Sequence, residues 1–258
     1  MQGNSASPRF SRLLTASAMA LACFCSAASA ADLAVLSAGA IEPGLKAAAA
    51  AFDKQTGHTT KITFNTAPEL KKRMDTNPAF DVVIAPPPVI GEFAGAGKLA
   101  ETRANVGRVG MGVAVRDGSL APDMSSTDAF RRSVLAADSL VFNRASTGLY
   151  LEGLLKKMDL YSQVEAKTTR YPDGASVMEH VIKGKGNEIG FGAMTEILLY
   201  RGKGLTLVGP VPAEVQNYTS YTAAPLASGK QQALAQAFVT FLSGPVGKPL
   251  FGAAGVTD

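Results

Sequence analysis

Strand-like apolar runs alternate with helix-like segments along most of the chain, and this alternation limits the possible folds more than any other feature. The first set has strands expected at 33–36, 61–64 and 81–85, with helices expected at 43–54 and 69–74 between them. The third run reads DVVIA and is almost continuously apolar, which is typical of a strand whose two faces are both covered. This β-α-β-α-β order predicts a parallel sheet with right-handed crossovers.

A second set of the same kind follows. Strands are expected at 139–142, 166–170 and 188–192, and helices at 148–158 and 175–183. Strands at 109–115 and 218–224 would leave the first set and return to it. We therefore predict an α/β fold of two lobes, one made of residues 31–113 plus 218–258 and the other of residues 114–217. Ligands in such folds bind between the lobes, beyond the carboxyl ends of the strands.

The first thirty residues have the pattern of a secretory signal peptide. Arg9 and Arg12 precede the uncharged apolar stretch 13–24, and Ala28-Ser29-Ala30 forms an A-x-A cleavage site. We expect cleavage after Ala30 and a mature protein in the periplasm. The alternative is lipoprotein processing at Cys23, although Ala20 stands where leucine is usual at such sites.

Composition excludes several classes of protein. Removing 30 of the 258 residues takes away two arginines and no acid, so the formal net charge falls from +4 to +2. Such a weak positive charge does not predict a nucleic-acid partner. Both cysteines, Cys23 and Cys25, are also removed, so the mature chain would have neither a thiol nucleophile nor a thiolate metal ligand. Apolar residues make up 47% of the chain, which argues against disorder.

Four strand-to-helix loops share a composition of small and hydroxyl residues. Such loops expose backbone N–H groups at helix N-termini, where the helix dipole favours an anion. Two come from each lobe, so together they predict an anion site in the cleft. Ordinary helix capping is the alternative explanation for the same residues. The candidate ligand-binding residues in these loops are Ser37, Ala38, Gly39, Thr66, Ala67, Ser146, Thr147, Gly174 and Ala175.

Arg144 is a further candidate, because it lies one residue after a predicted strand and just before the hydroxyl pair Ser146-Thr147. A guanidinium there could hold a carboxylate or an oxyanion through two hydrogen bonds. A surface or interlobe salt bridge is the alternative role. Arg170 is a similar but weaker candidate.

Few residues suit catalysis. His58 lies in a polar turn, and His180 follows Glu179 on a predicted helix without an HExxH pattern. A nucleophile elbow, a Walker loop and a dinucleotide-binding glycine pattern are all missing from the sequence. We therefore predict no catalytic residues, no metal ligands and no cofactor.

Several stretches resemble type II periplasmic solute-binding proteins, closest to the molybdate-binding branch of the ABC transporter families. The stretches are 36–40, 51–57, 65–67, 80–85, 146–150, 188–191 and 237–245. The resemblance covers nearly all of residues 31–258. It implies a monomeric protein, not an enzyme, that binds molybdate or a related oxyanion and passes it to an inner-membrane ABC permease. A small organic carboxylate as the ligand, or a small-acid isomerase or dehydratase on the same fold, is the alternative.

The molybdate pattern matches this sequence only in part. The serine of the first loop falls at Ala40, and the serine of the second falls near Thr66 or Ala67. The contacts of the third and fourth loops fall at Thr147 and Ala175, where a backbone N–H would serve. Gly192 or Ala193 stands where the branch has a tyrosine. The resemblance therefore implies the fold more directly than it implies the ligand.

Overall fold

A computed structural model describes residues 1–3, 30–76 and 79–258, so most of the predicted signal peptide, with Cys23, lies outside the described residues. The strands are β1 (Asp32–Ala38), β2 (Thr59–Asn65), β3 (Val82–Ala85), β4 (Ala104–Arg116), β5 (Ser139–Asn143), β6 (Thr168–Tyr171), β7 (Glu188–Ala193), β8 (Leu205–Pro210) and β9 (Tyr218–Pro225). The α-helices are α1 (Glu42–Thr56), α2 (Ala67–Thr76), α3 (Pro87–Gly95), α4 (Thr127–Ala136), α5 (Ser146–Lys157), α6 (Tyr161–Val164), α7 (Gly174–Lys183), α8 (Met194–Leu198), α9 (Gln232–Leu242) and α10 (Gly247–Ala253). Three 3-10 helices are η1 (Gly39–Ile41), η2 (Glu165–Lys167) and η3 (Ala213–Val215).

The sheet contains the same arrangement twice. Its strand order is β2-β1-β3-β9-β4-β7-β5-β6, with β8 paired to β4. In the first half β1 lies between its parallel neighbours β2 and β3, and in the second half β5 lies between its parallel neighbours β6 and β7. The predicted parallel units are therefore confirmed. All six parallel strands place the loops that follow them at carboxyl-terminal edges of the sheet.

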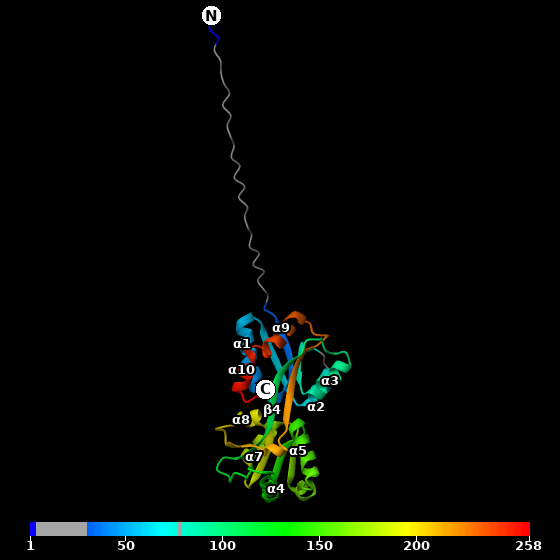
Figure 1. The fold of residues 1–258 in the computed structure, drawn as a ribbon, viewed down its shortest axis with the longest axis vertical. Coiled ribbons are helices and arrows are strands. Elements are labelled where there is room, and N and C mark those ends of the chain that lie inside the picture. The colour runs from blue at the N-terminus through cyan, green and yellow to red at the C-terminus, as the bar shows by residue number, and fades with distance from the viewer. Residues whose placement is uncertain (4–29, 77–78) are drawn as a thin grey trace.

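Two strands connect the halves, as predicted. The first part of β4, Ala104–Gly110, pairs antiparallel with β9, and the part from Met111 onward pairs with β7 and β8. Strand β9 pairs on its other side with β3, also antiparallel. Figure 1 shows the two groups of elements one above the other, with β4 and β9 running between them.

Buried side chains form separate clusters in the two halves. One cluster packs β1, β3 and β9 against α1, α9 and α10. In the second half Leu140 and Phe142 of β5 pack with Phe130 and Leu151, whereas Val141 packs in a different cluster with residues of α7. Neighbouring residues of a strand point to opposite faces, so helices cover both faces of this half. The uninterrupted apolar run of a doubly covered strand is explained by this packing.

Helix α4 was not among the sequence predictions. Its N-cap Ser126 accepts a hydrogen bond from the Ala129 N–H, and Phe130 and Val134 are fully buried. Its sequence TDAFRRSVLA has only a short apolar stripe, which explains why the pattern gave a weak signal. Within the described residues no helix is both long and apolar enough to cross a membrane.

Candidate functional site

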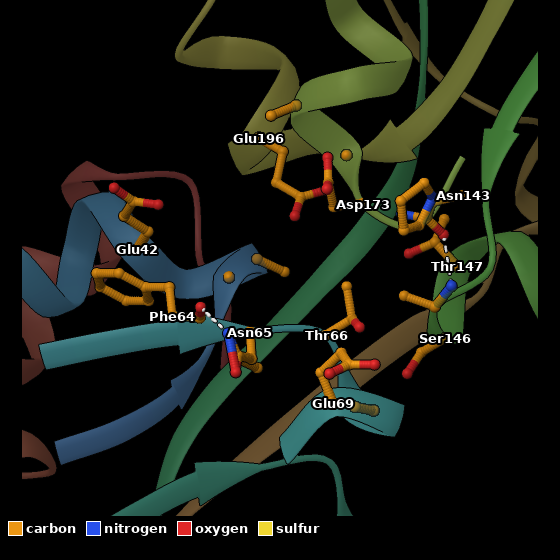
Figure 2. Close-up of a pocket in the computed structure, with 18 of the residues that line it drawn as sticks. Glu42, Phe64, Asn65, Thr66, Glu69, Asn143, Ser146, Thr147, Asp173 and Glu196 are labelled. Atoms are coloured by element: carbon orange, nitrogen blue, oxygen red, sulfur yellow. Dashed lines mark hydrogen bonds between the residues drawn. The ribbon is translucent and has the colours of Figure 1, made fainter. Parts of the chain in front are cut away.

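A cavity of about 580 Å³ lies where loops from both halves of the sheet meet. Most of its walls come from residues that directly follow the parallel strands, including Pro86 after β3 and Glu196 after β7. The lining residues are Ala38, Gly39, Ala40, Glu42, Phe64, Asn65, Thr66, Ala67, Glu69, Pro86, Asn143, Ala145, Ser146, Thr147, Pro172, Asp173, Gly174, Ala175, Glu196, Leu199, Tyr200, Lys203 and Tyr221. Figure 2 shows labelled side chains from both halves around this shared space.

The side chain of Asn143 organises the start of α5. Its Oδ1 accepts hydrogen bonds from the N–H groups of Ala145, at 3.0 Å, and Gly148, at 3.2 Å. Because the first N–H groups of a helix have no acceptor within the helix, those of Ser146 and Thr147 are left for the cavity. Gly148 is required here, since a Cβ at this position would overlap the Asn143 carbonyl oxygen.

The start of α7 has a similar construction. Asp173 is the N-cap, and its carboxylate accepts a hydrogen bond from the Ser176 N–H at 2.8 Å. The N–H groups of Gly174 and Ala175 precede that bond and line the cavity. The first half contributes η1 and the start of α2, with Gly39, Thr66 and Ala67 on the cavity wall.

Glu196 is the main charged group that the sequence analysis missed. Its carboxylate lies against Gly174, where a Cβ would overlap it, and near Gly39. The pKa of Glu196 is raised to about 7, mainly by burial and to a smaller extent by the carboxylates of Asp173 and Glu42. A hydrogen bond from the Ala193 backbone N–H acts in the opposite direction and lowers the pKa. No ion pair joins Glu196 to a lysine or arginine of the described chain.

Two tyrosines also line the cavity, although none stands at Gly192 or Ala193. Tyr221 on the connecting strand β9 is 3% exposed, and burial raises the pKa of its hydroxyl above the ordinary value. Burial also raises the pKa of Tyr200, and nearby carboxylates add to this effect. The Lys203 ammonium lies 5.7 Å from the centre of the Tyr200 ring.

Eight of the ten predicted binding residues line the cavity: Ala38, Gly39, Thr66, Ala67, Ser146, Thr147, Gly174 and Ala175. Ser37 does not. It is fully buried, and its hydroxyl donates to the Ala38 carbonyl at 3.2 Å. Arg144 does not line the cavity either. Its side chain is exposed, and its backbone N–H donates to the Tyr171 carbonyl at 2.8 Å.

Arg170, the weaker candidate, and His180, which the sequence did not favour, have structural partners outside the cavity. Arg170 forms an ion pair with Glu152 and donates to the Asn143 carbonyl at 3.3 Å. These two contacts help to fix the position of the loop before α5. The His180 Nδ1 lies 2.9 Å from the Tyr171 hydroxyl. Neither residue lines the cavity.

Sequence signals existed for some of the missed residues. Asn143 is a buried polar residue at a strand end, which is a typical position for a loop-organising amide. Glu196 is the third residue of α8 and bonds back to the N-cap Ala193, which is the spacing of half a capping box. That spacing indicates a cap and gives no information about burial. In the described part of the chain, no three His, Cys, Asp or Glu residues form a group that could hold a metal ion.

Comparison with known proteins assigns the family. Residues 33–257 match the family of bacterial extracellular solute-binding proteins, and the chain belongs to that family. The fold is that of the two-lobed type II periplasmic binding proteins. The periplasmic molybdate-binding protein of Azotobacter vinelandii has a TM-score of 0.73 and 18% identity, over 88% of this chain and 99% of that one. The sulfate-binding protein SubI of Mycobacterium tuberculosis also gives 0.73, with 17% identity, over 88% and 86% of the two chains.

One curated relative has a different description. A Pseudomonas protein named aconitate isomerase is 27% identical over 220 residues, which cover 82% of each chain. The family and the Azotobacter and Mycobacterium neighbours are named as binding proteins, whereas this Pseudomonas relative is named as an enzyme.

Proposed function

We propose that the chain is the periplasmic binding component of an ABC transporter and that its cavity captures a small organic acid. The observation that carries the proposal is the meeting of four helix starts, two from each half of the sheet, around one cavity. Backbone N–H groups at helix starts bind anions without the desolvation cost of a buried positive side chain. The organic acid is the alternative ligand of the sequence analysis, and the geometry favours it over molybdate.

Size and lining support a ligand with a carbon skeleton. A cavity of about 580 Å³ lies within the roughly 300–1,000 Å³ of typical small-molecule sites. A tetrahedral oxyanion has only five heavy atoms and no apolar surface. Phe64, Pro86 and Pro172 offer apolar walls that an organic acid could contact. Aconitate, the tricarboxylate in the name of the Pseudomonas relative, is a ligand of this class.

The cavity's own carboxylates restrict where an anion could sit. Glu42 is paired with Lys46 at 2.5 Å, and Asp173 is engaged as the cap of α7. Glu69 is exposed at the first turn of α2. A protonated Glu196 could donate a hydrogen bond to a ligand carboxylate. The ligand's charge would therefore lie nearest the starts of α5 and α7, away from Glu69.

Closure of the lobes would complete the site. We propose lobes of residues 31–113 plus 218–258 and of residues 114–217, which hinge at β4 and β9. An anion touching both sets of helix starts would favour the closed form, because only that form engages both lobes. A permease of the inner membrane would recognise the closed form.

The test is calorimetric titration of the mature protein with molybdate, tungstate, sulfate and a panel of organic acids that includes citrate, malate and both isomers of aconitate. We expect at least one organic acid to bind and molybdate to give no heat. Tight molybdate binding with no response to any organic acid would contradict the proposed ligand class.

The variant Thr147→Pro removes one N–H from the start of α5, where proline is tolerated in the first turn. We expect it to weaken binding by about 1.5–3 kcal/mol, the usual value of a hydrogen bond to a charged group. Thr147→Ala is the matched control, because it keeps the N–H and removes the hydroxyl. Equal losses in both variants would show that the hydroxyl, and not the helix start, holds the ligand.

A further inference from the structure

Glu196 has a placement that ligand capture alone does not require. Its carboxylate occupies the space where a Cβ of Gly174 would lie, passes close to Gly39 and points into the cavity (Figure 2). Its bond to the Ala193 N–H needs one oxygen and would serve equally well on an exposed helix start. Capping therefore explains neither the second carboxylate oxygen of Glu196 nor the burial of its side chain.

We propose that Glu196 moves a proton between two carbon atoms of an unsaturated carboxylic acid held in this cavity. The inference rests on the proposed function, because it requires that an organic acid binds there. The name of the Pseudomonas relative supports the substrate class, which is an acid with a C–H bond next to both a carboxylate and a carbon–carbon double bond. The product is the isomer in which the double bond has shifted by one position.

The surroundings of Glu196 suit a group that both takes up and returns a proton. Asp173, the N-cap of α7, and Glu42 on α1 disfavour the charged form of Glu196, and Tyr200 and Tyr221 lie close enough for Glu196 to raise their own pKa values. Lys203 lines the same cavity but forms no ion pair with it within the described chain. With its pKa near 7, Glu196 is present in both protonation states at neutral pH. A general base works best when its pKa is close to the working pH.

The step balances without a further reactant. The Glu196 carboxylate takes the proton from the saturated carbon, so that a C–H bond breaks and an O–H bond forms. The C–H electron pair becomes the new double bond, and the old double bond's pair spreads onto the far carbon and its carboxylate. Glu196 then returns the proton to that far carbon. Nothing is oxidised or reduced, and water is not consumed.

The helix starts would stabilise the charge that develops during this step. As the proton leaves, negative charge accumulates on the substrate carboxylates. Ser146 and Thr147 begin α5, Gly174 and Ala175 begin α7, and all four residues line the cavity, so their N–H groups are donors at fixed positions beside it. Preorganised donors of this kind stabilise the additional negative charge of the transition state relative to the bound substrate.

The experiment is proton NMR of the mature protein with cis-aconitate in D2O, together with calorimetry of the same samples. We expect deuterium to enter the methylene and vinyl positions and the trans isomer to appear. The rate should rise with pH through about 7, as Glu196 loses its proton. Glu196→Gln, which keeps the acceptor for the Ala193 N–H, should slow exchange by at least about 100-fold and change the Kd by less than about tenfold.

Two further variants complete the design. Glu196→Asp keeps a carboxyl group but shortens the side chain by one methylene, and it should retain measurable exchange. Glu179→Gln makes the same chemical change at an exposed position of α7, where Glu179 pairs with Lys183, and should exchange like the wild type. Binding of cis-aconitate without any exchange in the wild type would overturn this inference and leave the binding proposal intact. Exchange that survives in Glu196→Gln would overturn the role of Glu196. Failure to bind any organic acid would overturn the binding proposal itself, and this inference with it.

Discussion

The half-buried carboxyl of Glu196 should make the stability of the fold depend on pH in an unusual direction. Its pKa is about 7 in the folded protein, against an ordinary value of 4.5. Between these values the folded state holds more protons than the unfolded chain, so the free energy of unfolding falls as pH rises. The stabilising contribution is complete below about pH 4.5 and is lost by the time the pH has passed 7.

The magnitude follows from the two pKa values. At about 1.36 kcal/mol per pH unit, the change from 4.5 to about 7 corresponds to about 3 kcal/mol. About 2.5 kcal/mol of this falls between pH 5 and pH 8. Glu196→Gln cannot titrate, so the difference between wild type and variant isolates this one group from every other titrating residue.

The assay is urea unfolding of both proteins at half-unit steps from pH 5 to pH 8. We expect the unfolding free energy of the wild type to fall by about 2.5 kcal/mol relative to Glu196→Gln across this range. Parallel curves for the two proteins would refute the reasoning, because they would mean that Glu196 has the same pKa in the folded and unfolded chains.

Three further predictions concern other residues. Arg144→Ala should change the binding of any ligand by less than about 0.5 kcal/mol, because its exposed side chain does not line the cavity; a loss of 2 kcal/mol or more in calorimetry would place it in the site. Asp81→Ala should lower the unfolding free energy by about 3 kcal/mol, since the buried carboxylate accepts from the backbone N–H groups of Ala34 and Gln231; thermal melting would show this as a drop of roughly 5–10 °C, and an unchanged Tm would contradict it. Intact mass of protein from the periplasm should give Ala31 as the first residue, whereas a lipid-modified Cys23 would overturn the predicted cleavage site.

The fold was largely predictable because its strands are covered on both faces. DVVIA at 81–85 and the run at 139–142 have no polar face, so their apolar character is visible without knowing their neighbours. The parallel order followed from the helices between them. Helix α4 was not predictable in this way, because Phe130 and Val134 are buried by packing that a ten-residue pattern does not reveal.

Only the parts of the site that are formed by backbone groups could be predicted from the sequence. Small residues before helices mark exposed N–H groups, and the loops at Gly39, Thr66, Thr147 and Gly174 do meet at one cavity. Side chains were harder to place. Arg144 and Glu196 both lie within three residues of a strand end, yet one points to solvent and the other into the cavity. That difference depends on local backbone direction and on Gly174, whose missing side chain makes room for the Glu196 carboxylate.

The most direct test of organic acid capture is native mass spectrometry of the wild-type and Thr147→Pro proteins purified from the periplasm of the host. We predict that the wild type carries a small organic acid, identified by its added mass and fragmentation, and that Thr147→Pro has lost it. A wild-type protein that carries molybdate or tungstate, with the same ion retained by Thr147→Pro, would contradict both the ligand class and the role of the helix starts.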